Sequence, residues 1–216
     1  MTTLERGDWP RFSLAIFFME NINHLLFLWL NAPEQPAAPI LLLAIFLAEW
    51  MIWAIPLYLG IGWLFGDKTL RKSLLMASAS GVVALVISQL VGALWPHPRP
   101  FMIGLGHQFV AHVPDASFPS DHLTLWWAVA FSVWGQRGTR SLGTVMALVG
   151  LAIAWARIYV GVHFPLDMVG AIAVAWGSAW LSLIAAPLYL PTTYKLAVSI
   201  HRRLFGFLIR QGWLHG

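Results

Sequence analysis

The stretch Ala156-Arg157-Ile158-Tyr159-Val160-Gly161-Val162-His163-Phe164-Pro165-Leu166-Asp167 joins two strongly apolar runs. Three ionisable residues between such runs indicate a functional site, because charges are costly at membrane depth. Pro165 suits the first position of a helix, so we expect His163 just ahead of that helix and Asp167 in its first turn. An aspartate one turn from a histidine can orient the imidazole, and the Arg157 guanidinium suits phosphate oxygens. The alternative is a snorkelling arginine beside a capped helix.

The composition around this stretch is typical of a membrane protein. The 216 residues are 59% hydrophobic and 10% charged, and the mean hydropathy is +0.71. Apolar runs of about 20 residues, enough to cross a bilayer, recur along the chain. We therefore expect an all-α fold, a polytopic transmembrane helical bundle that forms a single domain over residues 1–216. No signal-peptide pattern is expected ahead of the first span, and the absence of cysteine excludes disulfides and thiolate ligands.

About five spans are predicted, covering residues 40–65, 73–95, 119–134, 141–160 and 165–188, with a kink at Pro56. This core, residues 40–188, follows an N-terminal segment, residues 1–37. Polar residues interrupt the apolar run there, which favours an interfacial or re-entrant helix over a span. The tail, residues 192–216, carries apolar and basic residues at helical spacing, which predicts an amphipathic helix on an anionic leaflet.

Basic residues predict the orientation. The loops 66–72 and 135–141 and the tail together hold nine of the thirteen Lys and Arg residues. Because Lys and Arg are enriched on the cytoplasmic side, the tail is predicted to be cytoplasmic and the long loop 96–118 to face outward with His163. The basic pI of 9.9 then reflects topology, and no nucleic-acid partner is expected.

Three separate segments are predicted to meet on the outer face. The long loop supplies Arg99, the start of the third span supplies Ser120 and His122, and the opening stretch supplies Arg157 and His163. Two arginines and a helix N-terminus can bind phosphate oxygens, while one histidine attacks phosphorus and the other transfers protons. Ser120 taken alone is typical of an N-cap. The combination on one face favours a phosphoryl-transfer site.

Some polar residues lie outside this set. Glu49 lies about 16 Å into the first span by helical rise. It either completes the site from below or makes a buried hydrogen bond to Ser88 or Gln89. Irregular spacing in a long loop favours solvated side chains over metal ligands for three histidines, so no metal site is predicted; they are His97, His107 and His112.

The motifs resemble those of the type 2 phosphatidic acid phosphatases, whose signature is Lys-x6-Arg-Pro, then Pro-Ser-Gly-His, then Ser-Arg-x5-His-x3-Asp. The matches are Arg99-Pro100, Pro119-Ser120-x-His122 and Arg157-x5-His163-x3-Asp167, within residues 40–188. The resemblance implies that His163 is the nucleophile, that Asp167 orients it and that His122 protonates the leaving group. It also implies that Arg99, Arg157 and Ser120 hold the phosphate, and that no cofactor or metal takes part.

Three positions depart from the signature: Gly92 replaces the Lys of the first motif, Asp121 the Gly of the second and Ala156 the Ser that opens the third. The first motif therefore depends on Arg99 alone, and Asp121 joins Glu49 as a possible accessory residue. The Pro-Ser-Asp-His form is similar to that of the bacitracin-resistance branch, the undecaprenyl pyrophosphate phosphatases. This similarity narrows the substrate to a polyprenyl diphosphate. We expect the protein in a bacterial cytoplasmic membrane with membrane lipids around it, and the asymmetry of basic residues predicts that the site faces the periplasm.

Three functions are compatible with these residues. The first is hydrolysis of undecaprenyl diphosphate through a phosphohistidine that water resolves. The second is related chemistry of the same family, either transfer of the phosphate to another lipid or cleavage of phosphatidate or phosphatidylglycerophosphate. The third is a lipid transporter whose arginines only bind phosphate headgroups.

Overall fold

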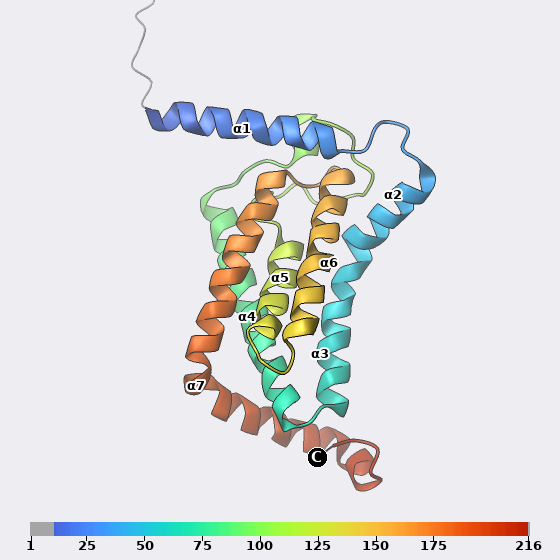
Figure 1. Ribbon diagram of the computed structural model, residues 1–216, viewed down its shortest axis with the longest axis vertical. Coiled ribbons are helices and arrows are strands. Elements are labelled where there is room, and N and C mark those ends of the chain that lie inside the picture. Colours follow the sequence, from blue (N-terminus) through green and yellow to red (C-terminus); the bar gives the residue numbers. More distant parts are fainter. Residues whose placement is uncertain (1–10, 216) are drawn as a thin grey trace, which may run out of the picture.

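The computed structural model describes residues 11–215, which are helical with connecting loops and contain no strand. The helices are α1 (Arg11–Leu30), α2 (Ala38–Ile45), α3 (Ala54–Phe65), α4 (Lys68–Leu94), α5 (Asp121–Trp134), α6 (Arg140–Tyr159) and α7 (Pro165–Arg210). Figure 1 shows an elongated bundle with α1 across one end, which we call the α1 end, and the last part of α7 across the other, the basal end. The predicted all-α class is confirmed.

Four segments are long and apolar enough to cross a membrane: Ala38–Phe65, Lys68–Leu94, Arg140–Tyr159 and Pro165–Arg210. The third predicted span is different, because α5 has only 14 residues and a rise of about 21 Å. Helix α5 packs against α4, α6 and α7, and most of its side chains are buried. Figure 1 shows it beginning well below the tops of α6 and α7, where the preceding loop enters the bundle. Protein rather than lipid surrounds α5, so its length need not match the bilayer.

The first predicted span is interrupted. A π-helical turn, Phe46–Trp50, and a 3-10 turn, Met51–Trp53, separate α2 from α3. Pro56 has no N–H to donate to the Ile52 carbonyl four residues earlier, and its ring crowds that carbonyl, which explains why the irregular stretch precedes it. The distortion predicted at Pro56 thus lies about one turn earlier. It places Glu49 in a π-turn, a feature frequent at functional sites.

Helix α4 begins earlier than predicted. Asp67 caps it by accepting a hydrogen bond of 2.7 Å from a backbone N–H, so residues 68–72 form helix instead of a loop. Arg71, which was predicted to lie in a loop, is buried in this first turn. Its guanidinium donates to the carbonyls of Trp63, at 2.9 Å, and His215, at 2.7 Å. Arg71 therefore joins three parts of the basal end.

Helix α7 is continuous over 46 residues, so the predicted end at residue 188 and the separate helix from residue 192 are wrong. Pro187 and Pro191 lie inside the helix and each removes a backbone hydrogen bond. Figure 1 shows α7 turning sharply near this point and running across the basal end. Its apolar side chains there are exposed, including Leu196, Ile200 and Leu204.

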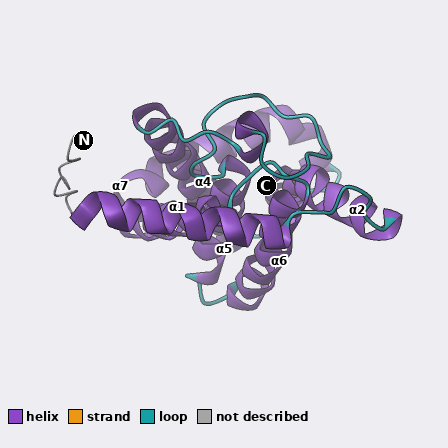
Figure 2. Ribbon diagram, turned by 90° about the horizontal axis from the view of Figure 1, so that it is seen from above, coloured by secondary structure: helices purple, strands orange, loops and turns teal. Residues whose placement is uncertain are grey.

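Helix α1 is not among the segments fit to cross a membrane. Figures 1 and 2 show it lying across the bundle. Phe27 is buried and packs edge-on against Phe164, with ring centroids 5.2 Å apart. Just after α1, the Asn31 amide donates to the carbonyls of His107 and Tyr159 at 3.0 Å each. These contacts attach α1 to the long loop and to the α6–α7 junction.

Candidate active site

The α6–α7 junction has the geometry predicted for it. Helix α7 begins at Pro165, so His163 precedes the helix and Asp167 lies in its first turn. His163 Nδ1 lies 3.1 Å from Asp167 Oδ2, and both side chains are buried. The same carboxylate oxygen accepts hydrogen bonds from the Phe164 N–H, at 2.8 Å, and from the Ser117 hydroxyl. Asp167 therefore holds the imidazole in one orientation.

The turn before His163 requires glycine at position 161. Gly161 has a φ of 84°, in the left-handed region that side chains disfavour. A Cβ at this position would collide with the carbonyl oxygen of His107. The neighbouring Phe109 N–H donates to the Val160 carbonyl at 3.0 Å. This close approach keeps the long loop packed against the junction.

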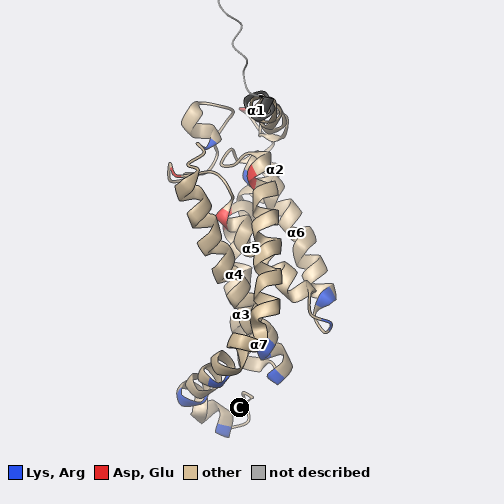
Figure 3. Ribbon diagram, turned by 90° about the vertical axis from the view of Figure 1, so that its left-hand side faces the viewer, with Lys and Arg blue, Asp and Glu red and all other residues tan. Residues whose placement is uncertain are grey.

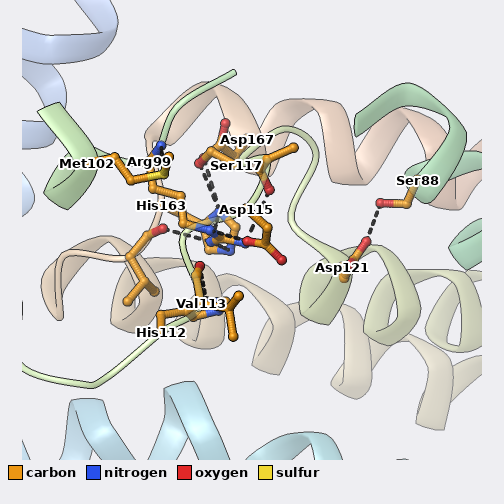
Figure 4. A network of polar contacts seen from close by, with 12 residues as sticks. Ser88, Arg99, Met102, His112, Val113, Asp115, Ser117, Asp121, His163 and Asp167 are labelled. Carbon is orange, nitrogen blue, oxygen red and sulfur yellow. Dashed lines mark hydrogen bonds and ion pairs between the residues drawn. The ribbon is translucent and has the colours of Figure 1, made fainter. Parts of the chain in front are cut away.

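Arg99 reaches His163 from the long loop. Its Nη1 lies 3.0 Å from His163 Nε2 and donates to the Val162 carbonyl, also at 3.0 Å. Its Nε and Nη2 both lie 2.8 Å from Asp115 Oδ1, as Figure 4 shows in part. Arg99 is buried, whereas the Asp115 side chain is 56% exposed. A phosphate that used the outer edge of this guanidinium would have to replace Asp115.

Arg157 lies on the other side of the site and is fully buried. Its Nη1 donates to the Ala48 carbonyl at 2.9 Å and lies 3.5 Å from Glu49 Oε1. Its Nη2 lies 3.0 Å from His112 Nε2. Glu49 thus contacts the site through Arg157, which agrees with the first of its two predicted roles.

Asp121 points away from the other site residues. Its carboxylate accepts hydrogen bonds of 2.6 Å from the Ser88 hydroxyl and from the Gln89 amide of α4 (Figure 4 shows the Ser88 contact). Ser88 and Gln89 were the hydrogen-bond partners predicted for Glu49 in the second of its two roles. They bind Asp121 instead, so that prediction is wrong. The Asp121 contacts anchor the start of α5 to α4.

The sequence did not predict His112 as part of the site. The interpretation of His112 as a solvated loop histidine is wrong, because its half-buried ring contacts Arg157 and lies 6.1 Å, centroid to centroid, from His163. His97 instead lies 3.3 Å from Glu20 of α1. No spacing in the sequence signals these contacts, because the loop has no periodicity. Over residues 11–215, no three His, Cys, Asp or Glu side chains are grouped so that they could hold a metal ion.

The start of α5 presents free polar groups. Ser120 occupies the N-cap position but its hydroxyl makes no capping hydrogen bond, so the simple N-cap interpretation is incomplete. Ser120 Oγ and Arg157 Nε are both buried and lack a hydrogen-bond partner within the part of the chain that the structure describes. Buried polar atoms normally have partners, so each of these two atoms has hydrogen-bonding capacity left for a ligand. His122 follows in the first turn of α5 and is half-buried.

The electrostatics favour a neutral nucleophile in a cationic pocket. Burial, followed by the charges of Arg157 and Arg99, lowers the pKa of His163 well below its usual value. Burial also lowers the pKa of His112, again with contributions from Arg99 and Arg157. Both rings are therefore neutral near pH 7, while the two guanidiniums remain positive. An unprotonated imidazole beside two arginines can attack an anionic phosphorus centre.

The match to known proteins agrees with this geometry. Residues 72–189, more than half of the chain, match the PAP2 superfamily, and the protein belongs to this superfamily. The resemblance to the type 2 phosphatidic acid phosphatases is thus confirmed. The crystal structure of Aquifex aeolicus LpxE has a similar fold, with a TM-score of 0.60 over 75% of this chain and 94% of that one at 18% identity. The chain is a multi-pass membrane protein.

Three relatives are similar in sequence. YbjG of Escherichia coli (strain K12), which carries the provisional name of an undecaprenyl-diphosphatase, is 36% identical over 91% of this chain and 98% of its own length. The undecaprenyl-diphosphatase BcrC of Bacillus subtilis (strain 168) is 39% identical over 61% of this chain and 67% of its own. The bacitracin transport permease protein BcrC of Bacillus licheniformis is 30% identical over 64% and 72%.

Proposed function

We propose that this protein hydrolyses undecaprenyl diphosphate to undecaprenyl phosphate and inorganic phosphate. The names of the Escherichia coli and Bacillus subtilis relatives support this substrate. The observation that carries the proposal is the buried His163, whose Nδ1 lies 3.1 Å from Asp167 while its Nε2 faces Arg99 at 3.0 Å. This arrangement leaves Nε2 as the nucleophilic atom next to a phosphate-binding group.

In the first step, His163 Nε2 attacks the terminal phosphorus in line. The Nε2–P bond forms while the bond from phosphorus to the bridging oxygen breaks, and undecaprenyl phosphate leaves with the electron pair. Arg99, Arg157 and the Ser120 hydroxyl would bind the phosphoryl oxygens, with the N–H groups at the start of α5. Asp167 stabilises the positive charge that develops on the imidazole.

In the second step, water attacks the phosphorus of the phosphohistidine. His122 accepts a proton from this water, the P–N bond breaks, and its electron pair returns to His163. Inorganic phosphate leaves the site. His122 is suited to this role because it lies on the first turn of α5, directly after Ser120 and Asp121.

An apolar recess beside the site suits the lipid part of the substrate. It has a volume of about 250 Å³ and lies between α1, the end of α4 and the first turns of α7. Asp167 lines it together with apolar side chains that include Trp95, Phe118, Leu166 and Val169. Apolar walls next to a few polar groups are typical of sites for lipid-like ligands.

For the membrane arrangement, we propose that α5 completes a fifth traverse inside the bundle and that the site faces the periplasm of a bacterial cytoplasmic membrane. Figure 3 shows most Lys and Arg residues at the basal end, which the positive-inside rule assigns to the cytoplasm. Helix α1 and the end of α7 would then lie along the two membrane surfaces. In intact cells, an impermeant thiol reagent should label Glu34→Cys and not Gly138→Cys; the reverse pattern contradicts this orientation.

Phosphate release tests the function. Purified protein with undecaprenyl diphosphate should release inorganic phosphate, in chelator as well as with magnesium, and His163→Ala should abolish release. Transfer of phosphate to an added lipid would instead support a phosphotransferase. Cleavage of phosphatidate or phosphatidylglycerophosphate that is faster than cleavage of undecaprenyl diphosphate would support a monoesterase. Neither release nor transfer would support transport, the function in the name of the Bacillus licheniformis relative.

A further inference from the structure

A second recess lies at the basal end, far along α7 from His163. It has a volume of about 640 Å³ and lies between the first turns of α4 and the bend of α7. Its polar wall consists of three lysines and a tyrosine: Lys68, Lys72, Lys195 and Tyr194. Its apolar wall comes from α7 and includes Leu183, Ala186 and Leu190. The phosphatase chemistry uses none of these residues.

The recess has the polarity of a phospholipid. Leu183 and Ala186 lie before Pro187, on the part of α7 that crosses the bundle, whereas Lys195 lies beyond the bend. From Pro165 to Pro187 helix α7 rises about 33 Å, close to the thickness of a bilayer hydrocarbon core, about 30 Å. Leu183 and Ala186 therefore lie at acyl-chain depth, Leu190 lies just past Pro187, and the lysines lie at headgroup depth.

The three lysines carry positive charge that no ion pair among the described residues offsets. Within residues 11–215, no lysine ammonium lies within 4.0 Å of a carboxylate. Asp67, the acid next to Lys68 in the sequence, is already engaged as the N-cap of α4. Lys72 is half-buried, with its Nζ 5.7 Å from the ring centroid of Tyr194. Three like charges around one recess repel one another and favour an anionic ligand.

We propose that this basal recess binds one anionic glycerophospholipid, with its phosphate among Lys68, Lys72 and Lys195 and an acyl chain along Leu183 and Leu190. Tyr194 and the half-buried Lys72 form the floor at headgroup depth. The inference depends on the recess and its charges and not on the reaction at His163.

Native mass spectrometry of the full-length protein in detergent tests this site. We expect one phosphatidylglycerol bound per chain, and at least tenfold weaker binding of phosphatidylcholine. The triple variant Lys68→Gln/Lys72→Gln/Lys195→Gln should bind phosphatidylglycerol about a hundredfold more weakly, in line with the contribution of three lysines near an anionic lipid. The variant Arg137→Gln/Arg202→Gln/Arg203→Gln removes the same charge from exposed positions outside the recess and should bind normally.

A variant that leaves every charge in place distinguishes binding of a lipid from binding of a free anion. Leu183→Ser/Leu190→Ser keeps every lysine, yet should lose phosphatidylglycerol because the acyl wall becomes polar. Inorganic phosphate should not displace the lipid. Equal losses in the two triple variants, equal binding of the two lipids, retention in the leucine variant, or displacement by inorganic phosphate would each overturn the proposal. Monodisperse elution of each variant confirms that it is folded.

Discussion

Arg157 Nη2 lies 3.0 Å from His112 Nε2, which joins a signature residue of α6 to a histidine of the long loop 45 positions away. The loop thereby closes over the site, because Arg99 from the same loop contacts His163 at 3.0 Å. The guanidinium of Arg157 is held on its other side by the Ala48 carbonyl. Its orientation is therefore determined by residues from two other segments, the long loop and the π-helical turn Phe46–Trp50.

His112→Ala should lower kcat/KM for undecaprenyl diphosphate by roughly tenfold, because a hydrogen bond to a charged group contributes about 1.5–3 kcal/mol. His163→Ala should abolish the reaction, so His112 has the smaller, positioning role. A matched control is His107→Ala, whose exposed ring makes no hydrogen bond to the described site residues. Higher activity in His112→Ala would contradict positioning and show that His112 obstructs Arg157.

Asp115→Asn should strengthen inhibition by inorganic phosphate, lowering its inhibition constant by up to about fivefold. The Asp115 carboxylate contacts the outer edge of Arg99 and competes with phosphate for it, and a partly exposed ion pair of this kind contributes about 0–1 kcal/mol. Glu34→Asn, which removes an exposed carboxylate after α1, should leave the constant unchanged. Weaker phosphate binding in Asp115→Asn would mean that Asp115 positions Arg99 instead of competing for it.

Ser120→Ala and Asp121→Ala should have opposite effects although the residues are adjacent. The Ser120 hydroxyl has no protein partner, so its removal should lower kcat/KM by about tenfold and leave thermal stability unchanged. Asp121 binds Ser88 and Gln89, so its removal should lower the midpoint of thermal unfolding and change kcat/KM by less than about threefold. Thermal unfolding and initial rates, measured on the two purified variants, test these expectations. A loss of stability in Ser120→Ala alone would mean that Ser120 is the structural residue and Asp121 is not.

His122→Ala should lower kcat/KM by different factors for substrates with different leaving groups. A lipid monophosphate has a second pKa of about 6 and leaves without a proton, whereas an alkoxide approaches the pKa of water, about 15.7, and needs an acid. The loss in kcat/KM should thus be far larger for a monoester such as phosphatidate than for the diphosphate, if both are cleaved. The ratio kcat/KM is the informative measure, because the later attack of water also uses His122 and lowers kcat for both. Equal losses for the two substrates would exclude His122 as the leaving-group acid.

The pH profile should report the lowered pKa of His163. The reaction needs the neutral ring, and burial with the charges of Arg157 and Arg99 keeps that ring neutral below pH 6.5. We expect kcat/KM to stay constant as the pH falls from 7.5 past the ordinary histidine pKa of about 6.5, and to fall only at lower pH. Arg99→Ala removes one of these charges, so its acid limb should shift to higher pH even though its maximum rate is lower. An acid limb near pH 6.5 in the unaltered protein, with no shift in Arg99→Ala, would contradict this electrostatic picture.

Short-range features of the site could be read from the sequence. Pro165 begins α7, and the i, i+4 spacing then brings His163 and Asp167 to 3.1 Å. Composition and apolar run lengths similarly predicted helices at the right places, with errors at their ends, at the interruption of the first span and at the short α5. One helical turn fixes such geometry whatever surrounds it.

Only the tertiary structure decided the partners across the site. Glu49 contacts Arg157, Asp121 takes Ser88 and Gln89, and His112 and Asp115 come in from the long loop. The length of α5 also depends on its neighbours, because helices on every side remove the need to match the bilayer. These contacts join residues up to about a hundred positions apart in segments without periodicity. Local propensity carries no information on such pairs, since packing of the whole bundle selects them.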